Sequence, residues 1–208
     1  MINVVLFDVD GVLLDSFEAN LKFYRDLALR TGYPPPSREE HRKTFHLPLW
    51  DKIKHITGLT EESEIQHIFD IAKSNEIPYD LSLVRTPKGL ETTITALRAK
   101  HVLGIVTSRI RARVFVSPDF EKLSPHFSTV VAYEDTENHK PHPEPLLCAA
   151  IHLGVEPNTC VYIGDVENDM KAAHAAGMKG VHLTQSKKHF GDARLASFRD
   201  LPAILADW

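Results

Sequence analysis

The sequence predicts an α/β protein built on a parallel sheet, with one all-helical domain inserted into it. Residues 4–7 form a short, wholly apolar run of the kind found in strands that are buried on both faces. From residue 87 onward, apolar runs alternate with helical patterns, which is typical of a parallel sheet covered by helices. Residues 16–81 instead show helical patterns and no strand signal. We therefore expect the two flanking parts of the chain to form the sheet together.

The inserted segment is expected to consist of amphipathic helices. Ser16 and Gly32 are typical residues for the start and the end of the first helix. Ser37, with Glu40 three residues later, has the spacing of a capping box and predicts the start of the second. Beyond these, the pattern predicts an apolar loop over 46–50, a helix over 50–56 that stops at Gly58, and a helix from Thr60 with Ile65, Ile68, Phe69 and Ala72 facing inward.

The rest of the chain is expected to supply the other strands and the helices that cover the sheet. Strands are predicted over 102–107, 129–133, 160–164 and 180–183, and helices over 90–100, 108–115, 145–153, 168–176 and 201–206. This alternation predicts a Rossmann-like core domain of residues 1–15 and 86–208. Residues 16–85 are the inserted helical domain, and hinges are expected near 14–16 and 84–88.

Composition argues against several classes of protein. The formal net charge of −4 gives no general basic field for nucleic acid. No stretch approaches the roughly 18 apolar residues of a membrane span, and the first residues lack the pattern of a signal peptide. Cys148 and Cys160 form no disulfide framework, and both are expected to be buried small hydrophobes. We therefore expect a cytoplasmic protein without nucleic acid or membrane partners, either a monomer or a homodimer.

Polar side chains stand at the carboxyl ends of the predicted strands. Asp8 and Asp10 follow the first strand, Thr107 and Ser108 the second, and Asp165 the fourth. The carboxyl ends of parallel strands meet at one edge of the sheet, where open α/β sheets bind their ligands. Two like charges about 4 Å apart repel by about 4 kcal/mol at an effective dielectric of about 20, a cost that a divalent cation removes. The sequence therefore predicts a metal site around Asp8 and Asp10.

Lys140 precedes the helix that leads to the fourth strand, so it can join the same edge. Carboxylates, a lysine and a hydroxyl group gathered there suit phosphoryl transfer, because the metal and the lysine neutralise the phosphate oxygens. One of the carboxylates can then act as the nucleophile and form an aspartyl phosphate.

Four motifs, present in order, resemble those of the haloacid dehalogenase-like superfamily. The match is to its phosphoglycolate-phosphatase-like branch, which has a helical cap inserted after the first motif. The motifs are Asp8-x-Asp10-Gly11-Val12-Leu13-x-Asp15-Ser16, Val106-Thr107-Ser108-Arg109, Lys140-Pro141-His142-Pro143, and Gly164-Asp165-x-x-x-Asp169 followed by Ala172-Ala173-x-x-Ala176-Gly177. Each motif alone is weak, but the ordered set is specific and covers nearly all of the predicted sheet portion. The resemblance implies that residues 16–85 are a cap domain.

The resemblance also implies a role for each matching residue. Asp8 would attack phosphorus, and Asp10 would protonate the leaving group and then activate the hydrolytic water. Thr107 and Lys140 would hold the phosphoryl oxygens, with Ser108 as a further substrate-binding candidate. Neighbouring carboxylates are expected to raise the pKa of Asp10, which must carry a proton in the first step.

For the metal, the resemblance implies Mg²⁺. Its ligands would be the carboxylates of Asp8 and Asp165 and the main-chain carbonyl of Asp10. Asp169 would support this site, as a residue that orients the ligands. The metal and Lys140 would in turn keep Asp8 ionised.

An aspartate at position 10 resembles the phosphomonoesterase and phosphomutase branches of the superfamily. Sugar phosphomutases there tend to carry a histidine in the first cap helix, where this chain has Asn20. We therefore expect a Mg²⁺-dependent phosphatase that acts on a small phosphorylated metabolite. A sugar phosphomutase and a catalytically silent binding protein on the same scaffold stay as alternatives.

Other polar residues have a plainer interpretation beside the functional one. Lys140 could be a solvated surface lysine, because the loop before it is polar. For the apolar 46–50 loop, contact with substrate and packing within the cap both stay open. Helix-start, surface or solvated roles, rather than metal or substrate binding, are expected for Glu167, Asn168, His139, His142, Arg42 and Lys43.

Overall fold

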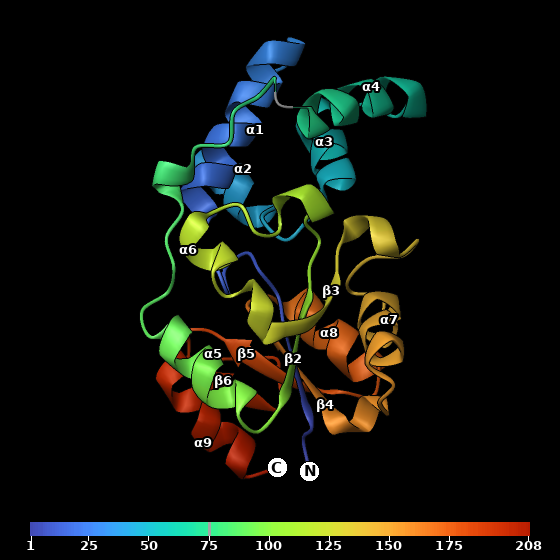
Figure 1. Ribbon diagram of the computed structural model, residues 1–208. Helices are drawn as coiled ribbons and strands as arrows, with labels where there is room; N and C mark the ends of the chain where they lie inside the picture. Colours follow the sequence, from blue (N-terminus) through green and yellow to red (C-terminus); the bar gives the residue numbers. More distant parts are fainter. Residues whose placement is uncertain (75) are drawn as a thin grey trace. The chain divides into compact units, whose positions relative to one another are not determined.

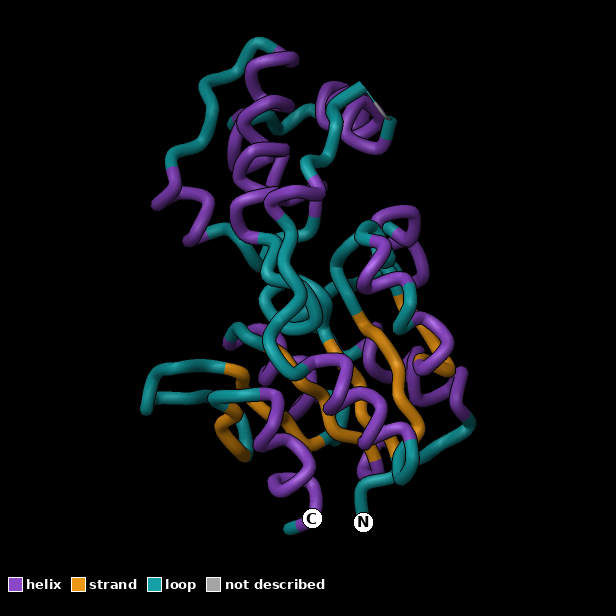
Figure 2. Tube along the Cα trace, turned by 60° about the vertical axis from the view of Figure 1, so that its left-hand side comes forward, coloured by secondary structure: helices purple, strands orange, loops and turns teal. Residues whose placement is uncertain are grey.

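The computed structural model describes residues 1–74 and 76–208 and divides into two compact units. The sheet unit comprises Met1–Asp15 and Thr86–Trp208, and the helical unit comprises Ser16–Arg85. Figure 1 shows the labelled strands and several helices in the sheet unit, and α1 to α4 in the helical unit. Figure 2 shows the strands of the sheet unit running side by side. Within the described residues, no helix is both long and apolar enough to cross a membrane.

The sheet has six parallel strands in the order β3-β2-β1-β4-β5-β6. Their bounds are β1 (Val4–Phe7), β2 (Val102–Val106), β3 (Phe127–Val131), β4 (Cys160–Gly164), β5 (Lys179–Leu183) and β6 (Ala193–Leu195). All four residues of β1 are fully buried, as the apolar run predicts for a central strand. The predicted α/β parallel sheet is therefore confirmed.

Strand β1 marks the point at which the strand order reverses. It pairs with β2 on one side and with β4 on the other, with Phe7 opposite both Ile105 and Ile163. Open α/β sheets bind ligands at such a switch point, beyond the carboxyl ends of the strands. This register sets the residues that follow β1, β2 and β4 next to one another.

Helices cover both faces of the sheet. They are α5 (Leu90–Arg98), α6 (Pro118–Glu121), α7 (Glu144–Leu153), α8 (Glu167–Ala175) and α9 (Leu201–Ala206). Alternate residues of β1 and β4, such as Leu6 and Tyr162, form one buried cluster with Leu146 of α7 and Ala172 of α8. The helices α5 and α9 pack against each other beside the sheet (Figure 1). Successive side chains of these fully buried strands point to opposite faces, so each face has its own apolar layer.

The helical unit contains α1 (Phe17–Thr31), α2 (Arg38–Lys43), α3 (Leu49–Thr57) and α4 (Glu62–Lys73). Gly32 ends α1 in the left-handed conformation, with φ of 83°. The predicted capping box is present, because Glu40 N–H donates to Ser37 Oγ at 3.2 Å and Ser37 N–H donates to the Glu40 carboxylate at 2.7 Å. The four residues predicted to face inward on α4 are all buried.

Several predicted boundaries in this unit differ from the structure. Ser16 occupies the N-cap position of α1, but its side chain makes no capping hydrogen bond. The pattern predicts an apolar loop that ends at Trp50, yet α3 already begins at Leu49. Pro48 occupies the N-cap position, and proline is tolerated at the start of a helix. Thr60 lies outside α4, whose N-cap is Glu61.

In the sheet unit, the helix predicted over 108–115 is wrong. Only a 3-10 segment, Arg111–Arg113, forms there, followed by the short α6. The guanidinium group of Arg109 donates to the Arg113 carbonyl at 2.8 Å and so competes with the helical pattern. Pro118 also disfavours a helical conformation at Ser117, which instead caps α6.

One strand prediction needs correction, and one strand was missed. The third strand runs over Phe127–Val131 rather than 129–133, because Asp135 accepts the N–H of Ala132 at 2.7 Å and turns the chain. Strand β6 was not predicted, since its three residues are too few to show alternation.

The cysteine prediction holds for one residue only. Both thiols are free, and Cys160 is buried as expected. Cys148 is half-buried on α7, with its sulfur 3.6 Å from His152 Nε2.

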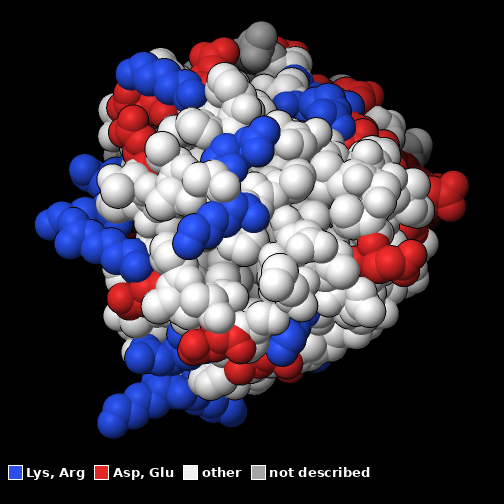
Figure 3. All heavy atoms as spheres, turned by 60° about the horizontal axis from the view of Figure 1, so that its bottom comes forward, with Lys and Arg blue, Asp and Glu red and all other residues white. Residues whose placement is uncertain are grey.

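Figure 3 shows the face of the sheet unit where the chain termini lie. Positively and negatively charged side chains are interspersed on it, in keeping with the small net charge.

Candidate active site

Asp8 directly follows β1 and continues its pairing, because its N–H donates to the Ile163 carbonyl at 2.9 Å. One oxygen of its carboxylate accepts the Val9 N–H at 2.8 Å, and the other lies 3.0 Å from Lys140 Nζ. Burial raises the pKa of Asp8 from 3.8 to about 6, Lys140 opposes this rise, and Asp169 and Asp10 add to it. The carboxylate is therefore held in one orientation at the centre of the strand edge.

The side chain of Lys140 is only 7% exposed, so the solvated-lysine interpretation is wrong. Its ammonium group contacts Asp8, donates to Asp169 at 2.7 Å, and donates to the Tyr162 hydroxyl at 2.8 Å. The Tyr162 hydroxyl in turn donates a hydrogen bond to the Val106 carbonyl at 2.8 Å. Burial alone lowers the pKa of Lys140, but Asp169 and Asp8 raise it well above its ordinary value. The ammonium group thus stays charged and has three fixed partners.

Asp169 lies in the first turn of α8 and is fully buried. One of its oxygens accepts from Lys140, and the other accepts the N–H groups of Asp165 and Val166 at 3.1 and 3.3 Å. Gly164 makes room for this arrangement, since a Cβ there would lie 2.3 Å from Asp169 Cβ. With both oxygens engaged by the protein, Asp169 is suited to hold the loop that carries Asp165.

Asp8, Asp165 and Asp169 bring carboxylate oxygens to within 4.8 Å of one another. Burial raises the pKa of Asp165 well above its usual value, Asp169 and Asp8 raise it further, and Lys140 opposes them. Three carboxylates share one lysine, so negative charge is in excess. Oxygen ligands with excess negative charge fit a hard divalent cation such as Mg²⁺. The convergence expected from the sequence is therefore present in the structure.

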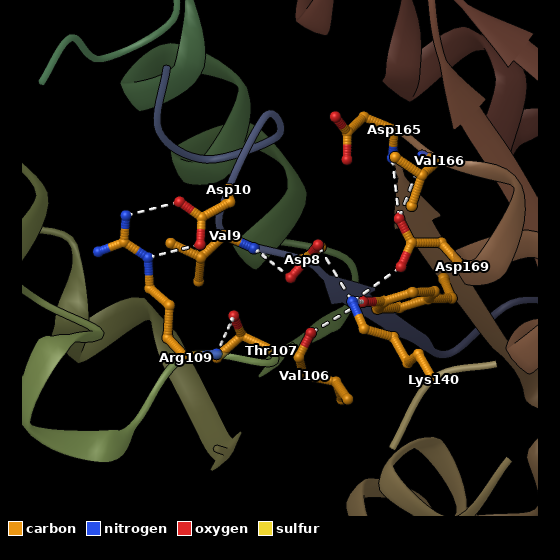
Figure 4. Close-up of polar contacts among 11 residues, drawn as sticks. Asp8, Val9, Asp10, Val106, Thr107, Arg109, Lys140, Asp165, Val166 and Asp169 are labelled. Atoms are coloured by element: carbon orange, nitrogen blue, oxygen red, sulfur yellow. Dashed lines mark hydrogen bonds and ion pairs between the residues drawn. The ribbon is translucent and has the colours of Figure 1, made fainter. Parts of the chain in front are cut away.

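Asp10 points to a different partner. Its two carboxylate oxygens accept from the guanidinium group of Arg109 at 2.6 and 2.7 Å, and 8% and 21% of the Arg109 and Asp10 side chains are exposed. Figure 4 shows this pair on one side of the site and the Asp8–Lys140 pair on the other. The expected carboxylates of Asp8 and Asp165 are close enough for Asp10 to raise their pKa values, and the structure adds a cation, the Arg109 guanidinium group, against the Asp10 carboxylate.

Thr107 and Ser108 follow β2. Thr107 is buried, donates its N–H to the Val131 carbonyl at 2.9 Å, and accepts the Arg109 N–H on its hydroxyl at 3.2 Å. Because Phe7 lies opposite Ile105, the chain beyond β2 runs beside Asp8. Ser108 is half-buried at the same edge. The structure thus brings Thr107 to the strand edge that carries the acidic cluster.

The other residues weighed in the sequence lie in ordinary surroundings. In the part of the chain that the structure describes, the acidic cluster is the one group of three ligand-type side chains close enough to share a metal ion, and no histidine belongs to it. The Asn20 amide oxygen accepts the Tyr79 hydroxyl at 2.8 Å. The Trp50 ring packs edge-on against Phe69. His139 stacks on Tyr133, His142 lies near Glu144, and Glu167 pairs with Lys171.

Sequence reasoning missed three residues that shape the site: Arg109, Tyr162 and His182. Arg109 stands inside the second motif, two positions after Thr107, so its place at a strand end was a usable signal. Tyr162 interrupts an aliphatic strand with a hydroxyl group, which a buried position obliges to find a partner. His182 is the penultimate residue of the strand predicted over 180–183, and it pairs with Gly164, directly before Asp165.

The acidic site lies at the switch point of a parallel, Rossmann-like sheet. This combination is typical of α/β enzymes whose catalytic residues follow the carboxyl ends of the strands. The profile of one family, haloacid dehalogenase-like hydrolase, matches residues 5–183. The chain belongs to this family of hydrolases, as the four motifs predict.

Curated relatives match along nearly the whole chain. Pyrophosphatase PpaX of Bacillus pumilus (strain SAFR-032) is 32% identical over 212 residues, which cover 98% of this chain and 96% of the relative. Pyrophosphatase PpaX of Bacillus cereus (strain AH820) is 30% identical, with 99% and 97% covered.

Solved structures agree with the fold. A HAD-superfamily hydrolase of subfamily IA, variant 1, from Geobacter sulfurreducens PCA is 30% identical with a TM-score of 0.72, and the match covers 98% of this chain and 96% of that one. A putative phosphoglycolate phosphatase from Lactobacillus plantarum has a TM-score of 0.83 at 23% identity, with 98% and 100% covered. At that identity, the second likeness shows the fold alone.

Proposed function

We propose that this hydrolase is a Mg²⁺-dependent phosphatase that transfers the phosphoryl group of a small phosphorylated compound first to Asp8 and then to water. The observation that carries the proposal is the buried arrangement of Asp8, Lys140 and Asp169, with Asp165 beside it. A carboxylate fixed at a ligand-binding edge, with a lysine at one oxygen, suits a nucleophile that must stay ionised close to a phosphate.

The residues present fit the metal that the family implies. Asp8 and Asp165 would hold Mg²⁺ through their carboxylates and Asp10 through its main-chain carbonyl, while Asp169 would orient Asp165. When bound, Mg²⁺ supplies charge neutralisation for the phosphoryl oxygens. It would also offset the burial and the mutual repulsion that raise the pKa of Asp8 and Asp165.

In the proposed mechanism, an oxygen of Asp8 attacks phosphorus and the bond from phosphorus to the leaving oxygen breaks. Asp10 gives a proton to that oxygen, and then takes a proton from the water that attacks the aspartyl phosphate. Phosphate leaves and Asp8 is regenerated. Thr107 would hold a phosphoryl oxygen, with Ser108 beside it. Lys140 would hold another by turning to it one of the three N–H donors that here contact Asp8, Asp169 and Tyr162. Each Asp10 oxygen accepts one N–H of Arg109 and keeps a second lone-pair site, at which the proton would be held.

The proposal assigns the helical unit the role of a cap that selects the leaving group, with hinges near 14–16 and 84–88. The proposed location of the protein is the cytoplasm, as expected from the sequence. The substrate class rests on the relatives: because the curated relatives are named pyrophosphatases, inorganic pyrophosphate is the first compound to test.

The test is phosphate release from a panel of pyrophosphate, sugar phosphates and other phosphomonoesters. Each compound is assayed with Mg²⁺ and with EDTA, using wild type, Asp8→Asn and Asp10→Asn. We expect Mg²⁺-dependent release that falls by about three orders of magnitude or more in Asp8→Asn. Release that persists in Asp8→Asn contradicts the covalent mechanism. A sugar bisphosphate that accumulates in place of phosphate supports the phosphomutase, and inertness toward the whole panel supports a binding protein.

A further inference from the structure

His182 lies at the carboxyl end of β5, next to the loop that carries Asp165, and is 5% exposed. Its Nε2 atom lies 2.9 Å from the main-chain carbonyl oxygen of Asp165, and its Nδ1 atom lies 3.2 Å from the main-chain nitrogen of Phe190. A carbonyl oxygen only accepts and a main-chain N–H only donates. The neutral ring with its proton on Nε2 satisfies both contacts at once.

The main chain of Asp165 is therefore held on both sides. Its N–H donates to Asp169 at 3.1 Å, and its carbonyl oxygen accepts from His182. Fixing the two peptide groups that flank a residue fixes the direction of its Cα–Cβ bond. The carboxylate then lies against Gly11, where an added Cβ would be 2.1 Å from Asp165 Oδ2. The position of this carboxylate thus depends on a histidine that is not among the residues the family motifs mark.

We propose that His182 is a positioning residue that sets the affinity of the site for Mg²⁺ by fixing the main chain of Asp165. This inference rests on the proposed metal site and adds a residue to it. Groups that orient metal ligands typically change metal affinity by about 10-fold to 100-fold when they are lost. The same ring also accepts a hydrogen bond from the Phe190 N–H. The alternative is therefore a purely structural role, in which His182 only holds the loop before β6.

Two substitutions separate these roles because each keeps one contact of the ring. The amide nitrogen of glutamine takes a position like that of Nε2, so His182→Gln keeps a donor for Asp165 and loses the acceptor for Phe190. The amide oxygen of asparagine takes a position like that of Nδ1, so His182→Asn keeps the acceptor and loses the donor. His174→Gln is the control, since His174 is an exposed histidine of the sheet unit that contacts Asp192 at 3.1 Å.

The experiment is calorimetric titration of each full-length variant with MgCl₂, without substrate, and its thermal midpoint in EDTA is measured separately. We expect His182→Asn to bind Mg²⁺ about 10-fold to 100-fold more weakly than wild type. His182→Gln and the control should stay within about 3-fold. In turnover assays, the Mg²⁺ activation constant of His182→Asn should rise while the KM measured at saturating Mg²⁺ is unchanged.

The inference is overturned if His182→Asn binds Mg²⁺ as wild type does, or if both His182 variants lose affinity equally in step with their thermal midpoints. A wild-type protein that shows no Mg²⁺ binding instead refutes the proposed metal site itself. The two failures are therefore distinguishable.

Discussion

At the scale of single residues, the site is a charge balance around one buried ammonium group. Lys140 touches Asp8 and Asp169, and both carboxylates raise its pKa against the effect of burial. Removing either partner of such a buried pair is costly, because the remaining charge is left in a poorly solvating environment. The position of Asp8 is thus tied to that of Lys140, and through Tyr162 to the carbonyl of Val106.

The raised pKa of Asp8 predicts that Mg²⁺ binding depends on pH. The folded protein holds a proton on Asp8 up to about pH 6, whereas an unfolded chain releases it near 3.8. Without metal, this difference lowers the free energy of unfolding as pH rises from about 4 to about 6. With metal, protons compete, so Mg²⁺ affinity should fall by up to about tenfold per pH unit below about pH 6 for each proton displaced. Calorimetric titrations at about pH 5.5 and about pH 8 check this, and equal affinities would contradict it.

The ion pair of Arg109 and Asp10 predicts a measurable coupling. A partly buried pair with two short hydrogen bonds should give a coupling free energy of about 1–3 kcal/mol in a double-mutant cycle of Arg109→Gln and Asp10→Asn. Urea unfolding of the four proteins measures it. The exposed pair of Lys43 and Glu39 is the control and should give less than about 0.5 kcal/mol. Coupling no larger than that of the control would show that the Arg109 pair contributes little.

At the scale of elements, the ends of β1 and β4 decide where the acidic side chains lie. The parallel register sets the residues after these strands side by side, although they are far apart in the sequence. A tight turn at Gly11, with φ of 76°, then leaves room for the Asp165 carboxylate. The positions of the motifs at strand ends were therefore predictable from the sequence, because parallel strands share one carboxyl edge.

Substitution of Gly11 should separate backbone strain from displacement of Asp165. Gly11→Ala would place its Cβ 2.1 Å from Asp165 Oδ2, whereas Gly177→Ala, at nearly the same φ of 73°, would meet nothing within 4 Å. We expect both variants to lose about 1–2 kcal/mol of stability from the left-handed backbone. Only Gly11→Ala should also lose Mg²⁺ affinity, measured by calorimetric titration. Similar losses of Mg²⁺ affinity in both variants would count against the close packing of Gly11 and Asp165.

At the scale of the whole molecule, the features that could be predicted from the sequence are those that leave a periodic pattern or stand at the end of a strand. The parallel sheet and the meeting of Asp8 with Asp165 follow from those patterns. The three-residue β6 did not show, because alternation needs more positions. The pairing of Arg109 with Asp10 was also missed, since it joins side chains 99 residues apart and depends on orientation rather than on pattern. The contacts of His182 escaped prediction for the same reason.

The most direct test of the account asks whether phosphate becomes attached to the protein during turnover. Wild-type protein is mixed with a ³²P-labelled substrate identified by the panel, quenched rapidly in acid, and assayed for protein-bound label. An aspartyl phosphate at Asp8 predicts label that needs Mg²⁺, is released by hydroxylamine, and is absent from Asp8→Asn. Steady turnover without any protein-bound label, together with retained activity in Asp8→Asn, would contradict the account.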